Sequence, residues 1–384
     1  MITRHILPVA KQSLTQFRAL CITGPRQSGK TTLSKALFKN KPYVNFENPT
    51  VQQNAETNPE AFLHQYRNGA VFDEVQRVPD IFRYLQEILD NNNQRGQFIL
   101  TGSNNFLLQE QVSQSLAGRA GYLSLLPLSY AELAGTQLDI KDVNKLMFTG
   151  GYPEIWNERL NPDIWHNSYI QTYVQRDVRL LRNITNLSVF NRFTYLCAHH
   201  AGQVMNRDEL ARQTGVDTKT VLAWLGLLEN SYLVFQLQPW YNNMQKRIIK
   251  SPKLYFYDTG LLCHLLGIKS MTALKKSNMY GAIFENWVIS EVRKNNFNAG
   301  QSGGMYYFRD STGNEVDLIT EKDGTSLAVE IKAGSKPNPA MLRSLNYWQK
   351  NQPNANCILM HGGNTHNEIS ERMSILPWTE VMNL

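Results

Sequence analysis

The sequence predicts an α/β protein in which a parallel sheet is followed by a helical region and then by a second α/β domain. Short apolar runs alternate with helical patterns as far as about residue 140, which is typical of a parallel sheet. From about residue 145 the periodicity is helical, and residues 280–384 return to alternating strands and helices. A chain of 384 residues has room for two or three domains. The expected domains are 1–140, 141–270 and 271–384.

The first domain is expected to contain five strands joined by helices. Each predicted strand is a short apolar run bounded by polar or turn residues, a pattern that indicates burial on both faces. The predicted strands are residues 19–23, 42–46, 70–74, 97–101 and 121–126. Helical patterns follow at 32–38 and at 130–134, where Ser129 is in position to cap the second helix.

A glycine-bounded loop joins the first predicted strand to the first predicted helix and matches the pattern G-x-x-x-x-G-K-[ST]. The flanking strand and helix make a phosphate-binding loop a better interpretation than a chance match at an ordinary turn. Backbone N–H groups of such a loop surround a polyphosphate. Lys30 is expected to contact the β- and γ-phosphates, and the Thr31 hydroxyl to ligate Mg²⁺. The expected nucleotide-binding residues are Gly24, Pro25, Arg26, Gln27, Ser28, Gly29, Lys30, Thr31 and Thr32.

Two carboxylates end the third predicted strand, about 43 residues after Lys30. Ligands of open α/β sheets bind at the carboxyl ends of the strands, where Asp73 and Glu74 are placed by this pattern. Asp73 is expected to hold the Mg²⁺, and Glu74 to orient and deprotonate the attacking water. Without the phosphate-binding loop, an Asp-Glu pair would indicate no more than a solvated turn.

The fourth predicted strand ends in polar residues that are further candidates for the same site. Ser103 and Asn104 follow the apolar run 98–101 and could reach the γ-phosphate or the attacking water. The alternative is an ordinary exit from a strand into a loop, and the sequence leaves both open.

The helical region contains a helix-turn-helix pattern over residues 206–228, with Gly215 at the turn, and a predicted strand at 232–237 completes a winged helix. Thr218, Lys219 and Thr220 begin the second helix and are the candidates for DNA contacts. Few Arg or Lys residues accompany them, although phosphate anchors are expected of a DNA-reading helix. A packing module between domains is the alternative.

A second set of charged residues occurs in the last domain. Glu285 lies on a predicted helix, Asp317 on the second strand of a predicted hairpin, and Glu330 and Lys332 two residues apart on the next strand. Residues two apart on a strand share a face. The three carboxylates are candidate ligands of a divalent cation, and Lys332 is a candidate catalytic cation. This order fits the PD-(D/E)xK nuclease pattern; the alternative is a nuclease-like fold that cuts nothing.

Composition sets broad limits on function. The net charge is +7, which permits binding to DNA without requiring it. Four scattered cysteines without C-x-x-C spacing argue against a disulfide framework or a zinc site and fit a reducing cytoplasm. The chain has no apolar stretch of the roughly 18–20 residues that span a membrane and no expected signal peptide. We therefore expect a cytoplasmic protein without a membrane partner.

With these parts placed, the chain resembles a group of prokaryotic proteins in which an AAA-type P-loop ATPase domain is joined through a winged-helix segment to a C-terminal restriction-endonuclease-like domain. The resemblance runs nearly end to end. It rests on the segments GPRQSGKTT, AVFDEVQ, ILTGSN, SLAGR, LPLSYAE, GGYPE, YIQTYVQRDV, KLYFYDTGLL, GAIFENWV, NEVDLI and AVEIKAG. It implies ATP and Mg²⁺ as cofactors. GGYPE and YFYDTGLL are typical of the group but indicate no chemistry.

The resemblance also implies candidates for an arginine that acts on the γ-phosphate of a neighbouring subunit. In AAA-type ATPases such an arginine often follows the fourth strand by one helix, which is the place of Arg119. Arg176, in the helical region, is a second candidate. Either role would require a homo-oligomer. An intramolecular ion pair is the alternative for both residues.

The combined interpretation is a Mg²⁺-dependent ATPase whose hydrolysis cycle rearranges a nuclease-like effector domain, with DNA as the expected partner. Two alternatives remain. One is a nucleotide-gated switch that turns over slowly, and the other is an adaptor with a catalytically silent nuclease-like domain.

Overall fold

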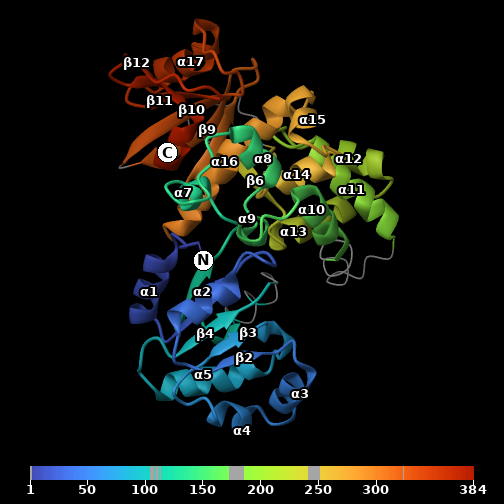
Figure 1. Ribbon diagram of the computed structural model, residues 1–384, viewed down its shortest axis with the longest axis vertical. Helices are drawn as coiled ribbons and strands as arrows, with labels where there is room; N and C mark the ends of the chain where they lie inside the picture. Colours follow the sequence, from blue (N-terminus) through green and yellow to red (C-terminus); the bar gives the residue numbers. More distant parts are fainter. Residues whose placement is uncertain are drawn as a thin grey trace. The chain divides into compact units, whose positions relative to one another are not determined.

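A computed structural model describes residues 2–103, 108, 112, 114–172, 186–240, 251–322 and 324–384. The chain divides into two compact units. Unit 1 comprises residues 1–128 with two short later segments, 230–232 and 296–301. Unit 2 comprises the remainder (Figure 1). Asn104 and Arg176 lie outside the described residues, so their predicted roles stay predictions.

Unit 1 contains the predicted parallel sheet. Its strand order is β2-β3-β4-β1-β5, and every pair is parallel. The strands are β1 (Ala19–Thr23), β2 (Tyr43–Asn45), β3 (Val71–Asp73), β4 (Phe98–Thr101) and β5 (Ala120–Ser124). The helices are α1 (Leu7–Gln16), α2 (Lys30–Leu37), α3 (Pro49–Thr57), α4 (Pro59–His64), η1 (Val75–Arg77) and α5 (Ile81–Asn91). The predicted order of strands and helices in this part of the chain is confirmed.

Alternation along β1 builds a core on each face of this sheet. All five residues of β1 are buried. Ala19 and Cys21 pack in one apolar cluster with residues of α5, whereas Leu20 and Ile22 pack in another with residues of α1 and α2. Successive strand residues point to opposite faces, so a strand covered on both sides must be apolar throughout. The covered sheet presents its polar groups at the carboxyl ends of its strands.

Unit 2 begins with a helical region. Ser129 is the N-cap residue of α7, as predicted, and its N–H donates to the Glu132 carboxylate at 2.9 Å. The helices here are α7 (Tyr130–Leu133), α8 (Val143–Thr149), α9 (Pro153–Asn157), α10 (Pro162–Tyr169), α11 (Leu187–His199), α12 (Arg207–Thr214), α13 (Thr218–Asn230), α14 (Thr259–Leu265) and α15 (Met271–Lys276). Gly215 ends α12 in the left-handed conformation that the expected turn requires.

Hydrogen bonds to Asp258 join two segments of the helical region, GGYPE and YFYDTGLL, for which the sequence indicated no chemical role. The Asp258 carboxylate caps α14 by accepting from Leu261 N–H and also accepts from Gly151 N–H. A Cβ at Gly150 would lie 2.3 Å from an Asp258 carboxylate oxygen, and Gly150 has φ +73°. Glycine is therefore needed at this position, and GGYPE and YFYDTGLL meet as a structural joint.

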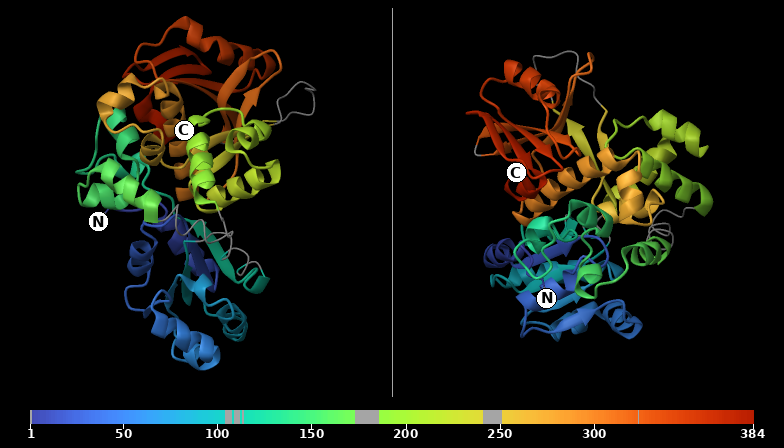
Figure 2. Two further views of the ribbon diagram at one scale, coloured as in Figure 1. Left: turned by 90° about the vertical axis from the view of Figure 1, so that its right-hand side faces the viewer. Right: turned by 45° about the horizontal axis from the view of Figure 1, so that its top comes forward.

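The rest of unit 2 is built on a mixed sheet of order β12-β13-β11-β10-β9-β8-β6-β7, coloured orange to red for β8–β13 (Figure 2). The strands are β6 (Val234–Pro239), β7 (Lys253–Phe256), β8 (Met305–Arg309), β9 (Glu315–Lys322), β10 (Thr325–Lys332), β11 (Asn356–His361), β12 (Asn367–Ser370) and β13 (Met373–Pro377). The helices are α16 (Tyr280–Asn298), η3 (Pro339–Leu342), α17 (Arg343–Asn351) and η4 (Trp378–Asn383). The fold class is confirmed: a parallel sheet, a helical region and a second sheet with helices.

Strand β6 connects the predicted helical domain with the predicted last domain. It pairs with β7 and also, in parallel, with β8 through Gln238 and Pro239. The structure therefore groups residues expected in 141–270 and 271–384 in one compact unit. Such long-range pairing leaves no local pattern in a sequence. No helix in the described part of the chain has both the length and the apolar character needed to cross a membrane.

Candidate nucleotide site and C-terminal charge cluster

The phosphate-binding loop connects β1 to α2 as predicted. Gly24 has φ +142°, and a Cβ there would lie 2.1 Å from the Leu125 carbonyl oxygen, so no side chain fits. Gly29 has φ +96° and is the N-cap residue of α2. The first N–H groups of a helix lack intrahelical partners, and here they follow Gly29 directly. The loop and the start of α2 together form an anion-binding shape.

Polar groups gather on the inner side of this loop. The Lys30 ammonium is buried and donates to the carbonyls of Gly24 and Pro25, at 3.0 and 2.8 Å. The Ser28 hydroxyl is buried without a hydrogen-bond partner. Arg4, which sequence reasoning missed, donates to the Ser28 carbonyl at 2.7 Å and supports the loop from behind. Burial lowers the pKa of Lys30, and the charges of nearby carboxylates oppose this shift.

The Asp73 carboxylate lies at the end of β3 and is surrounded by hydroxyl groups. Thr31 of the loop donates to it at 2.8 Å, Tyr43 of β2 also donates, and so does Thr101 of β4. Strand order explains this convergence, since β3 lies between β2 and β4. Within the described residues, Asp73 forms no salt bridge. Tyr43 and Thr101 were not predicted, because their proximity depends on the strand order.

Glu74 follows Asp73 in a left-handed conformation with φ +54°, which is uncommon for a residue other than glycine. Its carboxylate accepts from Gln76 and from the Ser103 hydroxyl, the latter at 3.0 Å. Ser103, at the end of β4, was predicted at this site, and the structure brings it to Glu74. Non-glycine residues held in this conformation cluster at functional sites.

These residues fit a nucleotide with Mg²⁺. The buried Ser28 hydroxyl lacks a partner, and the Lys30 ammonium lies inside the loop. Thr31 and Asp73 touch, as they must to share one cation: Mg²⁺ at a phosphate-binding loop is held by the loop hydroxyl and a strand-end aspartate.

Arg119 is engaged within unit 1. Its guanidinium forms a two-pronged ion pair with Asp90 of α5, at 2.6 and 2.8 Å. Arg119 comes directly before Ala120, which pairs with Ala19, the first residue of β1. The phosphate-binding loop begins after the last residue of β1, at the other end of the strand. Arg119 thus lies at the opposite edge of the sheet from the loop of its own chain. The ion pair of the intramolecular alternative is present, and the role of Arg119 at a neighbouring subunit stays a prediction.

The start of α13 carries acidic partners. Thr218 donates to Asp208, and Thr220 donates to Asp217, at 3.1 Å in each case. Lys219 is exposed between them. Two carboxylates beside the proposed recognition residues repel phosphate groups, so this geometry favours the packing alternative over DNA reading.

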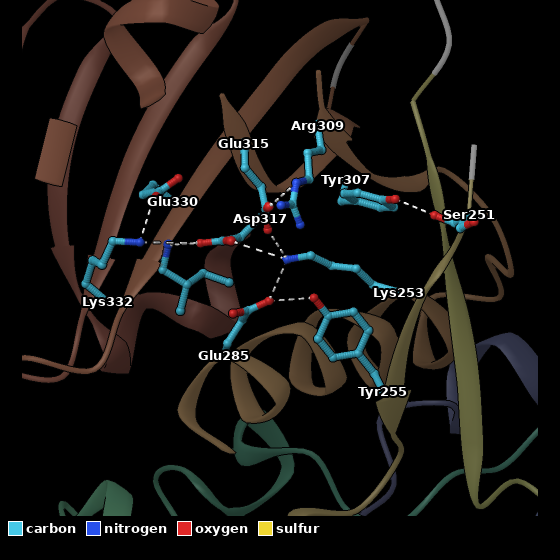
Figure 3. Close-up of polar contacts among 11 residues, drawn as sticks. Ser251, Lys253, Tyr255, Glu285, Tyr307, Arg309, Glu315, Asp317, Glu330 and Lys332 are labelled. Carbon is cyan, nitrogen blue, oxygen red and sulfur yellow. Dashed lines mark hydrogen bonds and ion pairs between the residues drawn. The ribbon is translucent and has the colours of Figure 1, made fainter. Parts of the chain in front are cut away.

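In unit 2, the structure brings Asp317, Glu330 and Lys332 together. Strands β9 and β10 are antiparallel neighbours with Leu318 opposite Val329, which sets Asp317 beside Glu330. The Lys332 ammonium contacts the Glu330 carboxylate and lies 3.9 Å from an Asp317 oxygen (Figure 3). The predicted hairpin, strand pairing and shared face are present.

A lysine that was not predicted lies among the carboxylates. The Lys253 ammonium, from β7, is 3.0 Å from Glu285, 2.5 Å from Glu315 and 3.6 Å from Asp317 (Figure 3). Tyr255, two residues on, donates to the same Glu285 oxygen at 2.6 Å. The signal for both was alternation: positions 253 and 255 of an apolar strand share one face.

Burial shifts the ionisation of this cluster. Burial raises the pKa of Glu330 to about 8, with a further contribution from the Asp317 charge, while Lys332 opposes the shift. Burial also raises the pKa of Glu285, against the effect of Lys253. For Lys253 burial acts to lower the pKa, but neighbouring groups, Glu285 and Asp317 among them, raise it well above its usual value.

The arrangement does not fit the predicted divalent cation. Across the part of the chain that the structure describes, no group of three His, Cys, Asp or Glu residues is arranged to hold a metal ion. Glu285, Asp317 and Glu330 are held by ammonium groups instead of facing one shared point. Lys253 contacts Glu285 and Asp317 because β7 joins the same sheet, and the metal-ligand role of Glu285, Asp317 and Glu330 stays a prediction.

Three stretches of the chain match known families. Residues 16–134 match the family described as "AAA domain", residues 140–272 a "Domain of unknown function (DUF8612)", and residues 280–381 a "Domain of unknown function (DUF4143)". With the loop geometry above, the first match identifies an AAA-type P-loop ATPase domain. The chain accordingly binds ATP.

Two mycobacterial proteins are similar over almost the whole chain. Uncharacterized protein Rv2008c of Mycobacterium tuberculosis and Uncharacterized protein Mb2031c of Mycobacterium bovis are each 31% identical over 376 residues. The match covers 97% of this chain and 82% of either relative. Among solved structures, the Walker-type ATPase PABY2304 of Pyrococcus abyssi is 14% identical, covering 69% of this chain and 96% of that one, with a TM-score of 0.47.

Proposed function

We propose, from the premise that this chain belongs to the same family as the mycobacterial proteins Rv2008c and Mb2031c, that it hydrolyses ATP with Mg²⁺ at the edge of the unit 1 sheet. One observation carries the proposal. Thr31 and Asp73 are in contact at the phosphate-binding loop, while the next carboxylate, Glu74, is held separately by Ser103. Hydrolysis needs both a metal ligand and a base, and two adjacent carboxylates with different partners can supply them.

The proposed roles follow from position. Lys30 binds the β- and γ-phosphates, and Thr31 and Asp73 hold Mg²⁺, which neutralises charge on the phosphate oxygens when bound. Glu74 orients the attacking water and accepts its proton. Ser103 is a positioning residue, since it touches the Glu74 carboxylate through its hydroxyl and its N–H.

Replacement of Glu74 tests this assignment. Glu74→Gln should bind ATP as the wild type does but hydrolyse it at least ~10²-fold more slowly, because the amide cannot accept the proton. Lys30→Ala serves as the contrasting variant and should lose binding by an order of magnitude or more. Normal hydrolysis by Glu74→Gln, with binding intact, would show that another group is the base.

We further propose that the hydrolysis cycle is transmitted along the chain through residues 230–232. This short segment belongs to unit 1, although the residues on both sides of it belong to unit 2. Its Tyr232 hydroxyl is 2.7 Å from the Thr23 hydroxyl, one residue before Gly24, and 2.9 Å from Ser124. A shift of the loop on hydrolysis would thus reach the connection between α13 and β6.

Tyr232→Phe tests the transmission. It should leave ATP binding intact and remove the nucleotide-dependent difference in protease sensitivity of unit 2. Ser124→Ala, which removes only the second partner, is the matched control. If both variants keep the wild-type difference between ATP and ADP, the segment does not transmit the cycle.

For the last domain, the lysine-filled cluster supports the alternative of an effector that does not cut. The net charge of the whole chain, +7, permits DNA as a partner. ATP turnover should therefore change when single-stranded, duplex or branched DNA is added, while the DNA stays intact with Mg²⁺ or Mn²⁺. Cleavage that is lost in Asp317→Asn would contradict the silent domain, and turnover indifferent to all three DNAs would contradict the partner.

A further inference from the structure

Three carboxylates in unit 2 surround a single buried ammonium group. The Lys253 side chain is only 2% exposed, and oxygens of Glu285, Glu315 and Asp317 all lie within 3.6 Å of its nitrogen. We propose that Lys253 is an internal cation that takes the place of a divalent metal ion, and that removing its charge opens a metal site made by these three carboxylates.

The number of N–H donors on the Lys253 ammonium equals the number of carboxylates around it. An ammonium has three N–H donors and no acceptor, and here it meets three carboxylates from two different elements, α16 and β9. Oxygen ligands of Mg²⁺ lie at 2.0–2.1 Å and those of Ca²⁺ at 2.3–2.6 Å. The three oxygens, at 2.5, 3.0 and 3.6 Å from the nitrogen, therefore need to move inward by roughly 0.4–1.6 Å to bind Mg²⁺ centred on the nitrogen position.

Neighbouring contacts hold Lys253 in this position. Tyr255, on the same strand face, shares the Glu285 oxygen with it. Two residues before Lys253, the Ser251 carbonyl accepts from the Tyr307 hydroxyl, and the Tyr307 ring lies 5.6 Å from the ammonium. In β7, Lys253 pairs with Leu237 of β6. The side chain is thus fixed on both sides, and it stays among the carboxylates.

The other cations of the cluster do not replace Lys253. Arg309 contacts only Glu315 among the three, at 3.4 Å, and is 40% exposed. Lys332 contacts Asp317 at 3.9 Å and is 38% exposed. Among the described residues, loss of Lys253 would leave Glu285 without an ion-pair partner and three carboxylates, one buried and two half-buried, facing one another. Such a set favours a divalent cation, which binds several carboxylate oxygens at once.

The inference deepens the proposed function of the last domain and rests on it in one respect, that this domain does not cut DNA. It is independent of the ATPase. A Lys253 variant can bind a metal ion without cutting DNA, and the wild-type chain can cut DNA without this metal site. The two proposals can therefore fail separately.

Mn²⁺ binding to the full chain without nucleotide tests the inference, measured by electron paramagnetic resonance. The wild type should bind no Mn²⁺ that depends on Asp317. Lys253→Met should bind one ion per chain with a dissociation constant on the order of 10⁻⁴ M, and adding Asp317→Asn should abolish it. Lys332→Met is the matched control: it removes the other lysine and should create no site.

Thermal unfolding supplies a second readout. Lys253→Met should melt lower than the wild type, and Mn²⁺ should raise its midpoint by about 5 °C while leaving the wild type unchanged. Should the variant fold only in the presence of Mn²⁺, the inference is supported. A folded Lys253→Met that binds no Mn²⁺, a variant that Mn²⁺ cannot rescue, or Asp317-dependent Mn²⁺ binding by the wild type would overturn it.

Discussion

The two acidic sites of this protein use similar residues and differ in what surrounds them. Asp73 in unit 1 accepts from three hydroxyl groups, those of Thr31, Tyr43 and Thr101. In unit 2, Glu285 and Asp317 contact the ammonium of Lys253. Hydroxyl donors orient a carboxylate and leave its charge uncompensated, whereas an ammonium group both orients and neutralises it.

This difference teaches that carboxylates in the right order do not by themselves predict a metal site. The neighbours decide whether negative charge remains for a cation to bind. Neutral donors around Asp73 leave its negative charge available for the Mg²⁺ of the proposed ATPase. In unit 2 the Lys253 ammonium lies among the carboxylates, at the position that a metal ion would take.

The largest expected effect separates the two sites by activity. Asp73→Asn should lower Mg²⁺-dependent ATP hydrolysis by roughly 10²–10³-fold, because it removes the negative charge opposite the metal. Asp317→Asn should leave hydrolysis within about twofold of the wild type if the fold persists. Steady-state turnover with each purified variant measures both. Equal losses in the two variants would break the distinction between the sites.

Stability should show the reverse order. Lys253→Ala leaves buried carboxylates without their cation and should lower the free energy of unfolding by about 3–5 kcal/mol. Tyr43→Phe removes one of the three hydroxyl donors of Asp73 and should cost about 1 kcal/mol. Chemical denaturation, followed by circular dichroism, measures the two. A Lys253→Ala variant as stable as Tyr43→Phe would mean that the ammonium group does not hold the cluster together.

A buried histidine away from both sites should make stability depend on pH. Burial lowers the pKa of His166 below its usual 6.5, against the charge of Asp258, and its Nε2–H donates to the Thr149 carbonyl. His264 and Asp163 are the other charged neighbours. Below about pH 6.5 the unfolded state binds a proton that the folded state does not, so stability is full above that pH and decreases as the pH falls.

The slope for this single group should approach about 1.4 kcal/mol per pH unit at its steepest, and denaturation curves between pH 5 and 7 measure it. His166→Gln should lose this part of the pH dependence. The decisive quantity is the difference between variant and wild type, because other groups titrate in both. Parallel curves for the two proteins would show that His166 takes up its proton equally in both states.

The smallest effect is expected for Arg119. Its guanidinium is paired with Asp90 at the edge of the sheet opposite the phosphate-binding loop. Arg119→Ala should therefore hydrolyse ATP at the wild-type rate per chain at every protein concentration. A large loss, restored by mixing with Lys30→Ala chains, would instead assign Arg119 to a neighbouring subunit's nucleotide.

Local patterns predicted what depends on neighbours in sequence. The phosphate-binding loop, the strand that ends in Asp73, and the face shared by Glu330 and Lys332 each follow from a few consecutive residues. Strands β8 and β9 could be paired as a hairpin because a short turn joins them. These elements are present in the structure where the sequence placed them.

Contacts between distant segments could not be predicted in this way. Lys253 reaches Glu285 and Asp317 only because β6 pairs with β8 and brings β7 into the same sheet. Tyr43 reaches Asp73 only because β2 is the neighbour of β3. Alternation along β7 puts Lys253 and Tyr255 on one face of a buried strand, but nothing local indicates which side chains of other segments lie against that face.

Counting Mn²⁺ ions per chain tests the central contrast most directly, by equilibrium dialysis with and without a non-hydrolysable ATP analogue. Mg²⁺-type ions bind through one or two carboxylates together with substrate phosphates, so one ion should bind only when the nucleotide is present. That ion should be lost in Asp73→Asn and kept in Asp317→Asn. An ion that binds without nucleotide and is lost in Asp317→Asn would contradict the account.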